Sequence, residues 1–118
     1  MKYILLLYAN PDAPFPPEAD REAAMADAMR IMGELEASGE WVGGEPLADV
    51  SQTKVVKQRD GVAAVTDGPF LESKEHLIGF CMIDAETPER AVEIAASWPD
   101  ARWHGVELRP VMTMSGDV

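Results

Sequence analysis

The order of the predicted elements indicates a ferredoxin-like α+β fold, an antiparallel sheet with two helices on one face and an extra hairpin. Two apolar runs, Tyr3 to Tyr8 and Leu77 to Asp84, are expected to form the central strands, because both faces of such runs favour burial. Val106 to Met112 alternates apolar and charged residues and contains Pro110, which is typical of an edge strand. A length of 118 residues fits a single domain spanning 1–118.

Two helices are predicted between these strands. The first spans Glu18 to Ser38 and ends at Gly39, with acidic residues in its first turn. The second begins at Thr87-Pro88-Glu89, where threonine suits the N-cap and proline the first helical position, and it ends before Pro99. Helical spacing gives each an apolar face: Met25, Ala28, Met29, Met32 and Leu35 in the first, and Ala91, Ile94, Ala95 and Trp98 in the second.

The middle of the chain carries the extra hairpin. Thr53 to Gln58 and Val62 to Thr66 are rich in strand-forming residues and flank an Asp60-Gly61 pair, which tolerates the positive φ angles of a tight turn. Before them, Trp41 to Leu47 is broken by two glycines and a proline and predicts a weak strand or a loop.

Two helices cover only one face of the sheet, so something else must cover the other face of the apolar strands. The expected cover is a second copy of the chain packed sheet against sheet, which makes the protein a homodimer with a largely apolar interface. The alternative is that the Thr53–Thr66 hairpin covers this face within one chain.

The net charge of the chain limits the classes of molecule that it is expected to bind. The net charge of −11, from 21 acidic and 10 basic residues, argues against nucleic acid and against an anionic membrane surface, since both require a basic patch. A small neutral or cationic ligand, or another protein, remains. Cys81 is the only cysteine, so no intrachain disulfide forms and a cytoplasmic location is expected. The apolar N-terminal run is too short to span a bilayer and lacks a cleavage site.

The sequence predicts neither a metal nor a cofactor. His76 and His104 are far apart in the chain, and Cys81 lies in the most apolar strand, where a small core residue is expected. No phosphate-cradling glycine loop is present, because Gly43-Gly44 alone is too short a signal.

The stretch TDGPFLESKEHLIGF, residues 66–80, allows two interpretations. In the structural one it is a stiff corner: Asp67 accepts backbone hydrogen bonds, Gly68 permits the turn, Pro69 fixes φ and Phe70 anchors the corner. This corner aims the strand that follows it.

In the functional interpretation the same stretch forms a site. Asp67 is the candidate acid/base and His76 the candidate proton shuttle, because the pKa of histidine lies near neutrality. Lys74 and Arg109 are the candidates for binding substrate and stabilising developing negative charge. Glu107 and Arg109 share one face of the last strand, where they pair with each other or with Lys74 and Asp67 across a cleft.

The motif resembles the signature of the YCII-related, or DGPF-domain, family. The opening KYILLLY and the closing GVELRPV, Gly105 to Val111, also resemble that family, so the likeness covers essentially the whole chain. The matching motif residues are Asp67, Gly68, Pro69, Phe70, Glu72, Lys74, Glu75, Leu77, Gly79 and Phe80.

The resemblance implies a dimeric α+β barrel and leaves function open between two classes. Some similar proteins carry a His–Asp pair thought to be catalytic, one type removes chloride from a chlorinated hydroquinone, and related barrels isomerise lactones. Other relatives occur with sigma-factor-like regulators. This chain has no histidine in its first helix, where the similar proteins with that pair carry theirs. The two hypotheses are a cofactor-free acid/base enzyme for a small metabolite and a non-catalytic ligand- or protein-binding dimer.

Overall fold

The computed structural model of the chain describes residues 1–10, 12, 16–69 and 75–118. Its main sheet is antiparallel and has the strand order β2-β5-β1-β6, formed by Trp41–Pro46, His76–Asp84, Lys2–Ala9 and Val106–Pro110. This order confirms the predicted ferredoxin-like fold, with the two apolar strands in the centre and β6 at an edge. The weak segment at Trp41 forms the opposite edge strand, β2.

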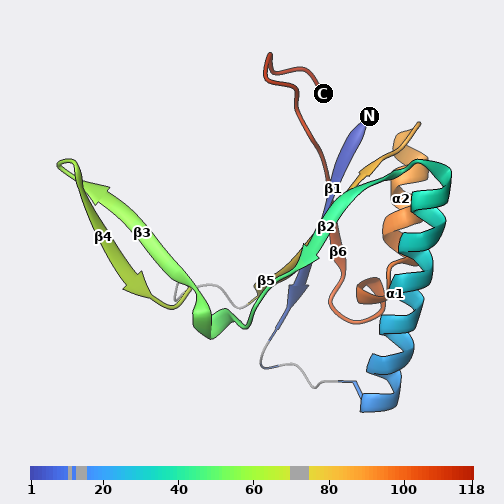
Figure 1. Cartoon of the computed structure of the whole chain (residues 1–118), viewed down its shortest axis with the longest axis horizontal. Helices are drawn as coiled ribbons and strands as arrows, with labels where there is room; N and C mark the ends of the chain where they lie inside the picture. Colours follow the sequence, from blue (N-terminus) through green and yellow to red (C-terminus); the bar gives the residue numbers. More distant parts are fainter. Residues whose placement is uncertain (11, 13–15, 70–74) are drawn as a thin grey trace.

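Both helices lie on the same side of this sheet, α1 (Glu18–Ser38) beside α2 (Pro88–Ser97), as Figure 1 shows. The helix ends agree with the sequence prediction. Gly39 closes α1 with a φ of 80°, and the Thr87 side chain accepts a hydrogen bond from the backbone N–H of Arg90 at 3.1 Å. Two short 3-10 helices, η1 (Val50–Gln52) and η2 (Pro99–Arg102), complete the connections.

The hydrophobic core fills the space between the helices and the sheet. Leu5 on β1 and Ile83 on β5 are fully buried, and the rings of Trp41 and Trp98 stack with centroids 6.4 Å apart. Cys81 is buried among them, as expected of a small core residue. The remaining members of this cluster are Tyr3, Leu7, Ile31, Leu35, Ala85, Ala91, Ile94 and Ala95.

The apolar face predicted for α1 is partly wrong. Met25 and Met29 are exposed, whereas Ala24 and Ile31 are buried together with Leu35. The packed face of α1 therefore follows the seven-residue spacing from Ala24 to Ile31. Met25 and Met29 lie beside this face on the helix and do not pack against the sheet.

The hairpin stands apart from this body. Within the described parts of the chain, β3 (Lys54–Arg59) and β4 (Val62–Asp67) pair only with each other, through a turn in which Asp60 and Gly61 have φ angles of 51° and 78°. Figure 1 shows this pair, here called the arm, projecting away from the sheet on the side opposite the helices. Every residue of β4 is exposed, so the alternative that the hairpin covers the sheet within one chain is wrong.

The projecting arm also gives the chain an extended shape. The radius of gyration is 16.5 Å, whereas a compact chain of this length is expected to have about 13–14 Å. Among the described residues no helix is long and apolar enough to cross a membrane.

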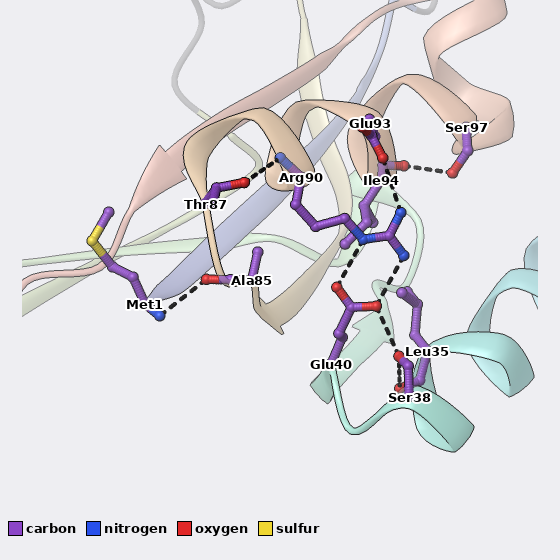
Figure 2. Close-up of polar contacts among 10 residues, drawn as sticks. All are labelled: Met1, Leu35, Ser38, Glu40, Ala85, Thr87, Arg90, Glu93, Ile94 and Ser97. Carbon is purple, nitrogen blue, oxygen red and sulfur yellow. Dashed lines mark hydrogen bonds and ion pairs between the residues drawn. The ribbon is translucent and has the colours of Figure 1, made fainter.

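A partly buried ion pair ties the helical layer together (Figure 2). The Arg90 guanidinium of α2 donates two hydrogen bonds of 2.9 Å to the carboxylate of Glu40, which precedes β2 and is only 17% exposed. Ser38 donates a third at 2.8 Å. These bonds hold the pKa of Glu40 below its usual value, since the Arg90 hydrogen bonds outweigh the cost of partial burial.

Candidate functional site

The face of the sheet that the helices leave open has an apolar centre and charged edges. Strand register puts two rows across it, each with two apolar side chains from the central strands β1 and β5. The four apolar side chains are half-buried. In order from β2 to β6, the rows are Glu45, Phe80, Leu6 and Glu107, and Gly43, Met82, Ile4 and Arg109.

Tyr8 adds a phenol to this open face. It follows Ile4 and Leu6 at two-residue spacing, so its side chain lies on the same side of β1. Burial is the main cause that raises the pKa of Tyr8, followed by the negative charge of Glu107 and a hydrogen bond with that carboxylate. Glu75 raises it further and Arg109 opposes the shift. Tyr8 is thus a protonated phenol held between two carboxylates and a guanidinium.

Asp67 ends β4 at the base of the arm. Its carboxylate lies 2.7 Å from Nζ of Lys54, the residue directly opposite in β3, and the side chain is 85% exposed. Beside it the backbone N–H of Gly68, whose φ is 90°, donates to the carbonyl of Thr53 at 2.7 Å. Within one chain Asp67 therefore fastens the base of the arm by its ion pair with Lys54.

The other predicted site residues are distributed between the two sheet faces. Arg109 lies opposite Ile4 on the open face. His76, half-buried at the start of β5, lies opposite Ala9, which belongs by alternation with Leu5 and Leu7 to the helix-covered face. One chain therefore does not bring His76 and Arg109 together. Lys74 lies outside the described residues.

Tyr8 and Glu107 were not predicted as a pair from the sequence. The available signal was alternation: Tyr8 continues the face of Leu6, and register places Glu107 directly opposite Leu6. The sequence contains both alternations but not the register between β1 and β6, which only the folded sheet fixes.

Three further features of the chain bear on possible sites: metal-binding groups, the Cys81 thiol and an apolar groove. Within the described parts of the chain, no group of three or more His, Cys, Asp or Glu side chains is placed to hold a metal. Burial and the nearby charge of Asp100 raise the pKa of the Cys81 thiol to about 12, so this cysteine stays protonated. An apolar groove of about 300 Å³ lies between α2, η2 and β6, lined by Val92, Ala95, Ala96, Ala101, Val106 and Leu108.

Comparison with known proteins identifies the family and the fold. The model of the YCII-related domain matches residues 1–115. An uncharacterised protein, R00369 of Rhizobium meliloti strain 1021, is 27% identical over 92 residues, covering 76% of this chain and 74% of that protein. The fold is similar to that of a solved structure, 5-chloro-2-hydroxyhydroquinone dehydrochlorinase from Burkholderia phenoliruptrix in complex with 2,5-dihydroxybenzoquinone. The two structures align with a TM-score of 0.53 over 99% of this chain and 100% of that protein, and the two sequences are 13% identical.

Proposed function

Because the chain belongs to the YCII-related domain family, we propose that it acts as a homodimer that binds a small polar metabolite and transfers a proton to or from it without a cofactor. The observation that carries this proposal is the half-buried Tyr8 phenol on the open face of the sheet, where Glu107 and Arg109 of β6 also lie and where burial and the Glu107 carboxylate raise the pKa of Tyr8.

The dimer places these groups in an enclosed space. Protein interfaces combine an apolar centre with a polar rim, and the open face has this pattern: Leu6 and Phe80 in the middle of a row, and Glu45 and Glu107 at its two edges. A second copy packed on this face would remove the apolar side chains from water and surround Tyr8 with protein on both sides.

The three polar groups have distinct roles in the proposed chemistry. Tyr8 keeps its proton at neutral pH and donates it, or a hydrogen bond, to an oxygen on which negative charge develops. Glu107 is the acceptor that takes a proton from the metabolite. Arg109 stabilises the developing oxyanion by its fixed positive charge.

Asp67, His76 and Lys74 remain proposals that rest on the motif. Asp67 is the proposed acid/base of the DGPF signature, assisted by His76, with Lys74 binding substrate. Since Asp67 is exposed and paired with Lys54 within one chain, its catalytic role requires a ligand or a second copy that displaces this pairing.

A non-catalytic binding role is the second candidate, and the Asp67–Lys54 pair favours it. Within one chain the Asp67 carboxylate is already engaged in an ion pair with Lys54 at 2.7 Å and is open to water, so it lies in no pocket enclosed by the described residues where it could meet a substrate. In this candidate function the dimer binds a small metabolite or a regulatory protein without converting it.

The fold neighbour indicates which probe to use. That protein is a dehydrochlorinase bound to 2,5-dihydroxybenzoquinone. This compound is a small acidic ring, and it carries negative charge once it has lost a proton. At 13% identity the likeness carries the fold alone, so the choice of an anionic ring depends on Tyr8 and Arg109. The cytoplasm is the proposed location, since the buried thiol of Cys81 forms no disulfide within the chain.

The test is calorimetric titration of the protein with 2,5-dihydroxybenzoquinone. Arg109→Gln is expected to raise the Kd about tenfold, because a charge-assisted hydrogen bond is lost. Arg30→Gln removes the same charge from the exposed side of α1, where Arg30 pairs with Glu34, and is expected to leave the Kd within about twofold. Equal effects of both variants would contradict a site at the open face.

Turnover separates the two candidate functions. Release of chloride from 5-chloro-2-hydroxyhydroquinone, above the rate without protein and lost in Tyr8→Phe, would support proton-transfer chemistry. Binding of the quinone with no chloride release would favour the non-catalytic function. Asp67→Asn and His76→Gln in the same assay test the motif-based assignments.

A further inference from the structure

The arm presents apolar surface that nothing in the described chain covers. Val56 and Val65 lie directly opposite each other on one face of the hairpin, and they are 64% and 55% exposed. Ala63 extends this face toward the turn by the same alternation. A two-stranded hairpin in water is marginally stable at best, so an arm that projects without support requires a surface to pack on.

The opposite face of the arm carries two basic residues beside Val55, Val62 and Ala64. Lys57 and Arg59 alternate with Val56 and therefore lie on the other side of β3. Residues 54–67 contain three of the ten basic residues of the chain but only two of its 21 acidic ones. The arm is thus the part of the chain with a positive balance, whereas the remainder is strongly negative.

We infer that the arm clasps a second copy of the chain, its Val56–Val65 face packed on the partner subunit and its basic residues near the partner's acidic surface. This inference rests on the proposed dimer and adds to it a second interface. The charge complementarity between a basic arm and an acidic body favours another copy of this chain as the occupant, because an acidic surface is present on every copy.

The dimensions permit the clasp. A six-residue strand extends about 20 Å, and four neighbouring strands span about 14 Å from first to last. The arm therefore has the length to cross a whole partner sheet. It is also inserted between β2 and β5, two adjacent strands of the main sheet, and it projects on the open side where the partner would lie (Figure 1).

Pairing of two arms edge to edge is disfavoured by the same charges. Lys57 and Arg59 of both copies would approach each other across the β3 edges, and charged residues on an edge strand oppose such pairing. Packing of the Val56–Val65 face on the partner's body buries the valines without this repulsion.

The test compares two substitutions on the same strand by sedimentation equilibrium. Val65→Lys places a charge on the face that packs on the partner and is expected to raise the dimer Kd at least tenfold. Val62→Lys places the same charge on the opposite face, at a position of similar exposure, 68%, and is expected to change the Kd less than threefold. Val56→Lys, across the hairpin from Val65, should reproduce the larger effect.

Hydrogen exchange gives a readout that is independent of affinity. In the wild-type dimer the amides of β3 and β4 should exchange slowly. In Leu6→Glu, which disrupts the open face and yields monomer, the same amides should exchange at least tenfold faster, because the arm then lacks its support.

The outcomes separate this inference from the proposed function. A wild-type dimer that Val65→Lys and Val62→Lys weaken equally, or not at all, overturns the clasp and leaves the sheet-to-sheet dimer standing. A chain that is monomeric at every concentration overturns both. A dimer weakened by Val65→Lys and Val56→Lys but not by Val62→Lys supports the clasp.

Discussion

The two faces of the main sheet differ in how far their apolar side chains are buried. On the helix-covered face, side chains such as Leu5 and Ile83 have no exposed surface at all. On the open face, their neighbours Leu6 and Met82 are half-buried and have no covering layer among the described residues. Alternate residues of the same strands thus lie in a closed core on one side of the sheet and on an uncovered apolar surface on the other.

This difference shows where stability and function divide in the molecule. The covered face contains apolar side chains and a polar tie, Arg90 with Glu40, whose bonds are all made within the chain. The open face carries the perturbed phenol of Tyr8 and the unpacked arm. Substitutions on the covered face should therefore change folding, and substitutions on the open face should change association and binding.

The largest expected effect contrasts two adjacent leucines. Leu5→Ala should lower the free energy of unfolding by about 2–5 kcal/mol, because it leaves a cavity in a closed core. Leu6→Ala should cost about 1 kcal/mol in dilute protein, since its side chain is only partly removed from water. Urea denaturation at two protein concentrations measures both. A cost for Leu6→Ala that equals that of Leu5→Ala in dilute monomer would contradict the contrast.

A smaller effect is expected from the polar tie. Arg90→Met should destabilise the chain by about 1–3 kcal/mol, because it leaves the shielded carboxylate of Glu40 without its two charged hydrogen bonds. Arg30→Met, the matched control on the exposed side of α1, should cost about 0.5 kcal/mol or less. Thermal unfolding of both variants beside the wild type provides the comparison.

Two carboxyl groups on the covered side should respond to pH with opposite signs. Arg90 holds the pKa of Glu40 below its ordinary 4.5, so its stabilising contribution is present above that pH and is lost as pH falls through the folded value. Burial raises the pKa of Asp100 above 3.8, so its contribution is present below 3.8 and is lost as pH rises through the folded value.

Asp100→Asn should therefore stabilise the chain at pH 7 relative to the wild type, and the difference should vanish in acid. Glu40→Gln should destabilise at pH 7, and this difference should also diminish as pH falls below 4.5. Unfolding free energies measured from pH 3 to 7 test both signs. An Asp100→Asn variant that is less stable than the wild type at pH 7 would refute the assignment.

The smallest effect is a shift in the titration of one phenol. The raised pKa of Tyr8 should fall toward 10.0 in Glu107→Gln, because the substitution removes the negative charge and the hydrogen bond with the carboxylate. Desolvation remains, so the return should be incomplete. Ultraviolet difference spectra between pH 8 and 12 follow it, with Tyr3 as the other tyrosine. An unchanged Tyr8 titration in Glu107→Gln would show that the Glu107 carboxylate does not raise the pKa of Tyr8.

The sequence predicted the architecture well where a local pattern was sufficient. Apolar residues at nearly every position marked β1 and β5 as central strands. Thr87, Pro88 and Gly39 marked the helix ends, because capping depends on the residues at the ends themselves. The rotation of α1 was predicted less well. Met25 and Met29 satisfy helical spacing, but the helix packs through Ala24, Ile31 and Leu35, and the spacing alone does not decide which side of the helix meets the sheet.

Contacts between polar residues that are far apart in the chain could not be predicted from the sequence. Arg90 and Glu40 are fifty residues apart, and no spacing rule connects them. Asp67 was expected to face its own turn or a cleft, but register places Lys54 directly opposite it, and that register depends on where the hairpin turn falls. The site hypothesis therefore grouped Asp67, His76 and Arg109 by chemical type, whereas the register shift between β1 and β5 places His76 opposite Ala9, on the other face of the sheet from Arg109.

Sedimentation equilibrium of the wild-type chain from nanomolar to hundred-micromolar concentration tests the open face most directly. A chain of 12.9 kDa should sediment with twice that mass at high concentration, and Leu6→Glu should return it to the single-chain mass while its circular dichroism stays that of a folded protein. A single-chain mass for the wild type across the whole range would contradict the proposal that a second copy covers the open face.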